Sequence, residues 1–159
     1  MGLFDFKKKK NAETPYEPRR EDPNALDLLE FTLDDNHCAV PVSSVREICQ
    51  YEKLMPSGLK HISIEGVFFF RDRPVAVVDL KKYLGMRKSE PSGRFIVVNT
   101  QGRDVAIHVS GVIGVNSVDR SSVLTSPNAP KCVTGAVKIN DVPTAVFDFE
   151  TIAADVFSV

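Results

Sequence analysis

Apolar and polar residues alternate with a period of two from about residue 26 onward, which predicts β-strands rather than helices. Residues 29–33 alternate, a polar turn follows, and residues 38–42 resume the pattern, as in a β-hairpin. After this hairpin, Ser43 or Ser44 is placed to cap a short helical turn over residues 45–48. The chain therefore begins its ordered part with a hairpin and a short turn.

The sequence repeats itself once. Residues 66–84 match residues 135–153 at a constant offset of 69, and residues 40–48 match residues 107–115 at an offset of 67. For each half, the pattern predicts a hairpin, a short turn, a long irregular segment, a second hairpin and a short helix, in that order. Six positions of the longer match are identical: Gly66/Gly135, Asp72/Asp141, Pro74/Pro143, Ala76/Ala145, Val77/Val146 and Asp79/Asp148.

The repeat indicates the physical class of the fold. Two units of about 65–70 residues are each near the lower size limit for an independent core, so we expect them to pack on one another. Val and Ile together number 29 against 10 Leu, and β-branched residues favour strands. We expect a mostly β fold of two small antiparallel barrels with short helices between and after them.

Residues 1–25 differ from the rest. They hold six basic and five acidic residues with prolines at 15, 18 and 23, and they contain too few apolar residues to offset the entropy of ordering. We expect a disordered tail, with residues 26–159 as the folded domain. The segment Leu3–Phe6 followed by Lys7–Lys10 is compatible with a frayed terminus, a docking peptide or a weak contact with anionic lipid.

Composition excludes several functional classes. The net charge of -1 and pI near 6.3 lack the excess of basic residues typical of nucleic-acid binding. No apolar run is long enough for a membrane helix and no signal peptide is evident, so we expect a cytoplasmic protein with no membrane insertion. The triplet Phe68–Phe70 allows a base-stacking platform, but residues 26–159 carry 14 basic against 16 acidic residues, which favours a core strand.

The sequence offers little catalytic chemistry. Cys38, Cys49 and Cys132 have no metal-site spacing and are expected to be buried thiols. The three histidines also lack a metal spacing, and His108 is expected on a strand surface because it matches Pro41 in the repeat. No nucleotide-binding or nucleophile motif occurs. We therefore expect no enzyme activity, no cofactor and no metal.

Asp79 and Asp148 are predicted helix caps. Asp79 ends an apolar strand, as a phosphoacceptor aspartate would, but the chain lacks the strand–helix alternation of such a domain. The repeat places Asp148 in the same local setting, at a strand end before a helix. We expect both carboxylates to cap the helices that follow them.

Arg46, Glu47 and Arg71 are charged residues beside apolar ones. An Arg–carboxylate pair next to exposed aliphatic side chains is typical of a protein-interaction surface. The same residues are also compatible with a solvated ion pair of about 0–1 kcal/mol. Their spacing alone leaves both interpretations open.

The motifs resemble one known family. The run Ala39–Ile48, then Leu54-Met55-Pro56, then residues 66–71, then residues 74–80 resembles the CheW family of chemotaxis coupling proteins. The second half continues the resemblance, which covers about residues 28–155. It continues through residues 106–109, residues 112–115, Gly135-Ala136 and residues 146–148.

The resemblance implies both a fold and a function. The fold is two interleaved five-stranded β-barrel subdomains packed across a hydrophobic seam. The function is that of a non-catalytic adaptor between the regulatory domain of the histidine kinase CheA and the cytoplasmic tips of methyl-accepting receptors, recruited to membrane-associated arrays. Kinase and adaptor domains would pack barrel against barrel.

The resemblance also implies a receptor-binding groove between the subdomains. Its residues here are Val45, Arg46, Glu47, Ile48 and Arg71. Where the family usually reads Asn-Leu-Arg-Gly, this chain has residues 69–72 as Phe-Phe-Arg-Asp, without the turn glycine. The alternatives are a small nucleic-acid-binding barrel, a regulatory domain separated from a larger kinase, or a similar adaptor for a non-chemotaxis kinase pathway.

Overall fold

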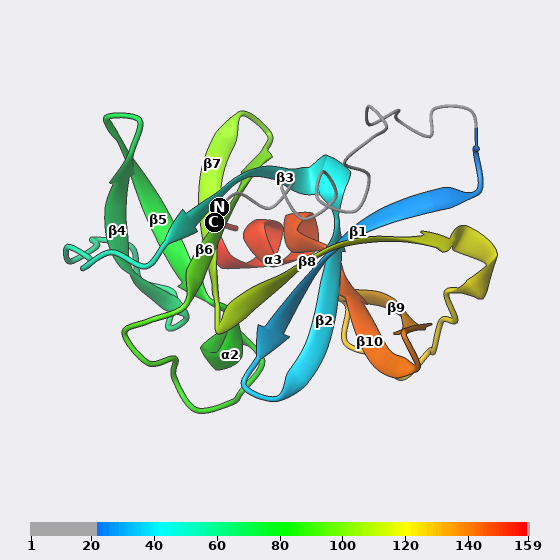
Figure 1. Cartoon of the computed structure of the whole chain (residues 1–159). Coiled ribbons are helices and arrows are strands. Elements are labelled where there is room, and N and C mark those ends of the chain that lie inside the picture. Colours follow the sequence, from blue (N-terminus) through cyan, green and yellow to red (C-terminus); the bar gives the residue numbers. More distant parts are fainter. Residues whose placement is uncertain (1–21, 159) are drawn as a thin grey trace.

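The computed structural model describes residues 22–158 as ten strands, two short 3-10 helices and two α-helices. The predicted tail, residues 1–25, lies outside the described residues up to residue 21, and the first strand begins at Ala25. Two five-stranded sheets lie on either side of helix α3 (Phe149–Val156), as Figure 1 shows. No helix of this described part is long and apolar enough to cross a membrane.

The element order follows the sequence repeat. The first half contains β1 (Ala25–Leu33), β2 (Asn36–Pro41), η1 (Val42–Ser44), β3 (Val45–Gln50), β4 (Ile64–Phe70), β5 (Arg73–Asp79) and α2 (Leu80–Tyr83). The second half contains β6 (Arg94–Thr100), β7 (Arg103–Val109), β8 (Gly111–Asp119), η2 (Arg120–Ser122), β9 (Val133–Ile139), β10 (Val142–Phe147) and α3.

The two halves exchange strands. One sheet has the order β8-β1-β2-β10-β9 and the other has the order β3-β6-β7-β5-β4; we call the parts built on them lobe A and lobe B. In each lobe the first hairpin of one half is completed by the third, fourth and fifth strands of the other half. The two lobes are therefore interleaved, and neither can form from one half of the chain.

The predicted mostly β, two-lobed and repeated fold is confirmed, with two differences in detail. Each sheet is antiparallel except for one parallel pair, β2 with β10 in lobe A and β5 with β7 in lobe B. These parallel pairs join strands from different halves, which an antiparallel hairpin cannot do. Among the described strands, the edge pairs β8/β9 and β3/β4 have no mutual ladder, so the sheets are not closed barrels.

The predicted helical turn over residues 45–48 is wrong. Only residues 42–44 form a 3-10 turn, and residues 45–50 form strand β3, which pairs with β6. The second half behaves alike, because its matching residues lie in β8, paired with β1. Both segments contain β-branched residues, which favour strands. Each forms an edge strand of a sheet, and the pairing with its neighbouring strand determines its conformation.

A large central core joins the lobes. It contains Phe31 and Val40 from lobe A together with Ile96 and Ile107 from lobe B, and α3 contributes Phe149 and other buried residues to it. Each lobe adds a smaller core of its own, centred on Phe68, Val77 and Phe95 in lobe B and on Leu28, Val137 and Val146 in lobe A. The continuous central core makes the two lobes one packed unit.

Two glycines of the repeat allow a close backbone approach. A Cβ on Gly66 would lie 2.6 Å from the Met55 carbonyl oxygen, and one on Gly135 would lie 2.7 Å from the Leu124 carbonyl oxygen. At these positions an extra strand segment pairs with β4 through a Met55–Val67 bridge and with β9 through a Leu124–Ala136 bridge. The identity of Gly66 and Gly135 thus follows from packing.

Candidate functional site

The charged residues predicted to face a partner lie at the free edges of the lobe B sheet. Glu47 is on edge strand β3, and Arg71 is in the turn after edge strand β4. The Arg71 guanidinium donates to Glu47 Oε1 at 3.1 Å, with the two side chains 61% and 42% exposed. The structure therefore brings Glu47 and Arg71 together across the opening between the two edge strands, in contact with solvent.

The turn that holds Arg71 has an unusual backbone. Arg71 and Asp72 have φ values of 51° and 63°, the left-handed conformation at both central positions of a two-residue hairpin turn. Glycine, asparagine and aspartate adopt this conformation readily, whereas arginine does so at a cost of about 1 kcal/mol. The matching turn of lobe A has the same φ signs at Asn140 and Asp141. The turn geometry survives the missing glycine, and it points a strained arginine toward β3.

Arg46 has a different partner from Glu47. A β-bulge between Val45 and Glu47 makes Arg46 the extra residue of β3. Its guanidinium lies 3.4 Å from Asp104 Oδ1, which also accepts a hydrogen bond from Asn99 Nδ2 at 2.8 Å. Sequence reasoning missed Asp104 because it lies 58 residues away, on a strand that pairs with β6 and not with β3.

The apolar members of the predicted site are only partly available. Val45 and Ile48 are half-buried and pack against the central core. Phe70 is buried, with the Arg71 guanidinium 5.0 Å from its ring centre, while Phe69 points outward and is 55% exposed. The predicted residues exposed at this edge are therefore the charged Arg46, Glu47 and Arg71, and Phe69 lies exposed beside them.

Asp79 and Asp148 lie at the start of the two α-helices. The Asp79 carboxylate accepts from the Lys82 amide, and the Asp148 carboxylate accepts from the amides of Glu150 and Thr151. Asp79 also accepts from the amide and hydroxyl of Ser89, so it holds the loop after α2 in addition to the helix. These bonds occupy both Asp79 oxygens with structural donors.

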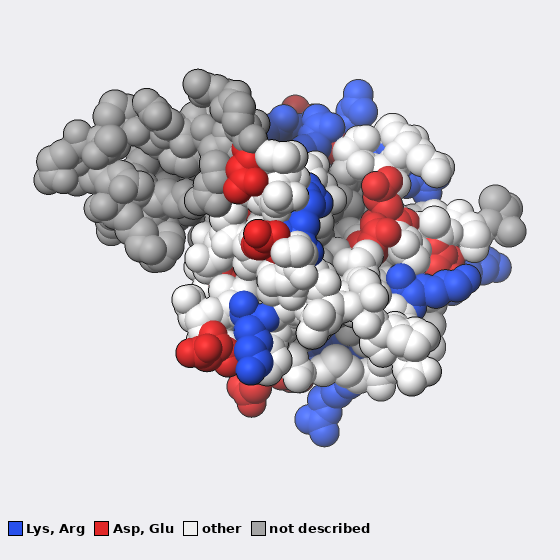
Figure 2. Space-filling view, turned by 90° about the vertical axis from the view of Figure 1, so that its right-hand side faces the viewer, with Lys and Arg blue, Asp and Glu red and all other residues white. Residues whose placement is uncertain are grey.

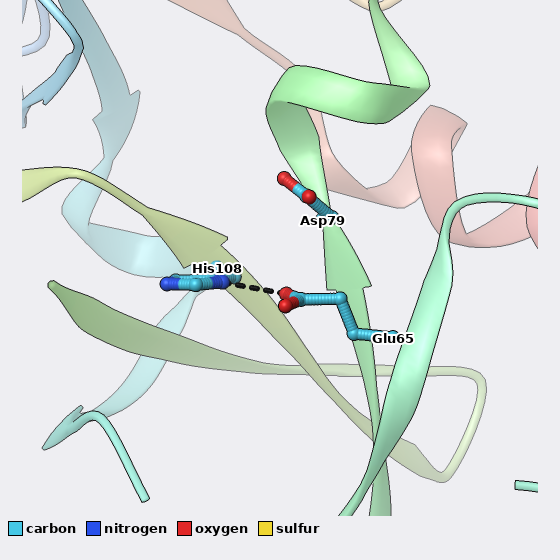
Figure 3. A group of neighbouring side chains, drawn as sticks. All are labelled: Glu65, Asp79 and His108. Atoms are coloured by element: carbon cyan, nitrogen blue, oxygen red, sulfur yellow. Dashed lines mark hydrogen bonds and ion pairs between the residues drawn. The ribbon is translucent and has the colours of Figure 1, made fainter. Parts of the chain in front are cut away.

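The expectation that His108 lies on a strand surface is wrong. His108 is completely buried, between the rings of Tyr51 and Phe95, because the loop after α2 and the start of β4 cover this part of β7. Figure 3 shows its ring directed at the Glu65 carboxylate, with Asp79 beside them at the end of β5. The match of His108 with Pro41 in the repeat could not predict this burial, since the loop that covers His108 comes from another part of the chain.

Potential metal ligands converge in one group of the described residues: Glu65, Asp79 and His108. Their three ligand atoms all lie within 4.8 Å of one another. The donors are already in use. Both nitrogens of His108 and both oxygens of Asp79 have hydrogen-bond partners, and Lys82 and Lys88 line the adjacent depression. The chemistry of this group fits an ion pair and a helix cap better than a cation site.

The three cysteines are free thiols. Burial raises the pKa of the Cys38 thiol to about 12 and also raises the pKa of Cys132. Burial, followed by the charges of Glu47 and Glu52, raises the pKa of Cys49. All three are protonated at neutral pH, which makes them poor nucleophiles and poor metal ligands.

Figure 2 shows acidic and basic residues interspersed on the face formed by lobe A. They do not gather there into one basic patch of the kind that binds a phosphate backbone. Single large apolar side chains are also exposed on the molecule. They are Met55, Leu59, Ile62, Phe69, Ile113 and Leu124.

Fold and surface together define a class: an interleaved two-lobed β protein whose exposed features are charged pairs and scattered apolar side chains, as in protein-binding modules. The family model described as the CheW-like domain matches residues 27–157. The chain therefore belongs to the CheW-like domain family, and the resemblance stated from its motifs is confirmed.

Individual relatives agree. The chemotaxis protein CheW of Thermotoga maritima is 28% identical over 104 residues, which are 62% of this chain and 69% of the relative. The CheW protein of Rhizobium meliloti is 26% identical over 104 residues, 64% of this chain and 67% of the relative. The crystal structure of the scaffolding protein TtCheW from Thermoanaerobacter tengcongensis superposes with a TM-score of 0.75 at 21% identity, covering 86% of this chain and 93% of that one.

Proposed function

We propose that this protein is a non-catalytic adaptor that couples methyl-accepting chemoreceptors to the histidine kinase CheA. The observation that carries the proposal is the match of the CheW-like domain over residues 27–157, which includes all of both lobes. The names of the relatives, chemotaxis proteins and a scaffolding protein, support the same role. Such an adaptor works in the cytoplasm, where it is recruited to receptor arrays.

We propose that the receptor binds at the edge of lobe B, where the predicted residues Val45, Arg46, Glu47, Ile48 and Arg71 lie. The family resemblance implies that the receptor binds through a tip helix, and a helix recognised in a groove presents apolar side chains at spacings of three and four residues. Phe69 supplies an exposed apolar contact, and the Glu47–Arg71 pair supplies charges that fix orientation. Val45 and Ile48, half-buried beneath them, support this edge.

The adaptor role is tested by titrating the full chain with the isolated CheA regulatory domain and with a receptor-tip fragment, using calorimetry. Binding to both is expected. A correctly folded chain that binds neither would exclude the adaptor function. Retention on a DNA or RNA column with a steep salt dependence would instead support the alternative of a nucleic-acid-binding protein.

The residue assignment is tested separately by charge reversal. Glu47→Arg and Arg71→Glu should each weaken receptor binding, and the double variant should recover part of the loss, since the pair is restored in swapped form. Lys138→Glu is the matched control, because this exposed lysine occupies the repeat position of Phe69 on the edge strand of lobe A. Strictly additive effects, or an equal effect of Lys138→Glu, would show that Glu47 and Arg71 are only a solvated pair.

A further inference from the structure

Both ring nitrogens of His108 face hydrogen-bond acceptors. Nδ1 lies 2.5 Å from Glu65 Oε1, and Nε2 lies 2.6 Å from the carbonyl oxygen of Ser92. A carbonyl oxygen can only accept, so Nε2 carries a hydrogen. The contact with the ionised Glu65 carboxylate needs a second hydrogen on Nδ1. The network is therefore complete only when the imidazole is doubly protonated and positively charged.

These two hydrogen bonds connect three separate segments. Glu65 belongs to edge strand β4, Ser92 to the loop between α2 and β6, and His108 to β7 in the middle of the lobe B sheet. Glu65 is the extra residue of a β-bulge in β4, since the register shifts between Ile64 and Gly66. A bulge redirects a side chain, and here the Glu65 carboxylate reaches inward to the ring, as Figure 3 shows.

The charges around the ring favour its protonated form. Burial by itself lowers the pKa of His108. The hydrogen bonds to Glu65 and to the Ser92 carbonyl, together with the negative charges of Glu65 and of Asp79 on β5, outweigh it and raise the pKa above its ordinary 6.5. Three other titratable groups line the surface depression next to Glu65 and Asp79. They are Tyr51 after β3, Lys82 on α2 and Lys88 in the loop after α2.

We propose that His108 is a proton-dependent latch that holds edge strand β4 and the loop after α2 against the centre of lobe B. When the ring loses a proton, Nε2–H keeps the Ser92 carbonyl and a bare Nδ1 faces the Glu65 carboxylate. The two lone pairs repel, and the Glu65 carboxylate, whose side chain is 21% exposed, has lost its donor. Strand β4 is then held less firmly, and with it the turn that carries Arg71. The latch itself does not depend on which partner binds that turn.

The sign of the pH dependence follows from the direction of the pKa shift. A pKa that is higher in the folded state than in the unfolded state stabilises the fold fully below the unfolded value, which is 6.5 for this group. The stabilisation decreases as the pH rises through the folded-state pKa. The latch is thus closed below pH 6.5 and opens as the pH rises through the raised pKa of His108.

Lobe A provides an internal control. Residue Pro41 occupies the position of His108 in the repeat, and Thr134 occupies that of Glu65. Thr134 is likewise a bulge residue, opposite the register shift between Val146 and Phe147, but its hydroxyl donates to the Val146 carbonyl instead. Strand β9 is therefore the counterpart of β4 without the titrating pair.

The test is NMR on the full chain. Ring resonances of His108 give its pKa, and amide hydrogen exchange, corrected for the intrinsic effect of pH, gives the opening of β4 and β9. We expect His108 to titrate above 6.5. The opening of β4, but not that of β9, should increase as the pH rises from 6.5 through the pKa of His108. The increase should approach tenfold for each unit by which the pKa is raised.

Two variants make the result decisive. Glu65→Gln removes the charge at a partly exposed position, so the His108 pKa should fall and the pH-dependent opening of β4 should disappear; Glu52→Gln, an exposed carboxylate in the nearby loop, should leave both unchanged. The latch is refuted if His108 titrates at or below 6.5, if β4 and β9 respond alike, or if Glu65→Gln titrates as the parent protein does.

Discussion

A single methyl group added at Gly135 is expected to destabilise the protein by about 2–4 kcal/mol. In Gly135→Ala the new Cβ would lie 2.6 Å from Val123 Cγ1 and 2.7 Å from the Leu124 carbonyl oxygen. The valine methyl can rotate, but the carbonyl belongs to the bridge in which Leu124 and Ala136 exchange two hydrogen bonds of 2.8 Å. Overpacking costs about 1–3 kcal/mol, and each weakened backbone bond costs about 1 kcal/mol.

Urea denaturation followed by circular dichroism measures this loss as a shift of the midpoint at constant slope. Gly114→Ala is the matched control, because a Cβ at this buried strand glycine meets nothing within 4 Å. It should change stability by less than about 0.5 kcal/mol, or increase it slightly through the unfolded chain. If Gly135→Ala is as stable as Gly114→Ala, the close approach does not explain why the repeat keeps this glycine.

Three further changes test other contacts. Asp148→Ala should cost about 1 kcal/mol as a lost helix cap at a half-buried position. Asp79→Ala should cost about 2–3 kcal/mol, because it leaves the donors of Ser89 without a partner at a buried site; equal shifts in thermal unfolding would show that Asp79 is only a cap. Asp34→Asn weakens the 2.7 Å contact with buried Lys81 and should cost about 1–2 kcal/mol, while Lys81→Met should be nearly neutral; equal urea midpoints for the two would contradict this reasoning. Tyr83→Phe removes a 2.7 Å hydrogen bond between α2 and α3 and should lower the unfolding free energy by about 1 kcal/mol; an unchanged melting curve would show that the bond contributes nothing.

The sequence was sufficient for the hairpins, the repeat and the helix starts. Residues 29–33 and 38–42 alternate because every second residue, Leu29, Phe31, Leu33, Cys38 and Val40, faces the central core. The period of two is kept where the ladder between the strands is regular. Asp79 and Asp148 were recognisable because each stands between a strand and a helix, where a carboxylate accepts from exposed amides. These features depend on near neighbours in the chain.

Strands β3 and β8 were missed for a reason visible in their register. Arg46 is an extra residue in β3, and Ile113 is the matching extra residue in β8, where Phe31 pairs with Val112 and Glu30 with Gly114. A bulge interrupts the period of two and leaves apolar residues three apart, as on a helix. The helical turn over residues 45–48 was predicted from Ser43 or Ser44 as a cap, and the pairing of this segment with β6 overrides that local signal.

The candidate site divides in the same way. Glu47 and Arg71 could be named together only through the family motif, because 24 residues separate them and a left-handed turn has to bring them into contact. His108 was expected on a strand, where it lies, but its burial could not be predicted, since its partners Glu65 and Ser92 lie 43 and 16 residues away. Contacts made by covering loops leave no periodic pattern in the sequence.

The two lobes have the same strand topology but differ in the side chains at their sheet edges. Lobe B carries charged groups at bulges and turns where lobe A carries Ile113, Thr134 and Asn140 at the matching positions. The strand exchange means that this charged edge is formed by β3 and β4 from the first half but is supported by β6 and β7 from the second. A partner that binds there contacts a sheet whose strands continue into the central core shared with lobe A. The lobe B edge and the central core therefore form one packed unit to which both halves of the chain contribute, an arrangement compatible with the proposed adaptor.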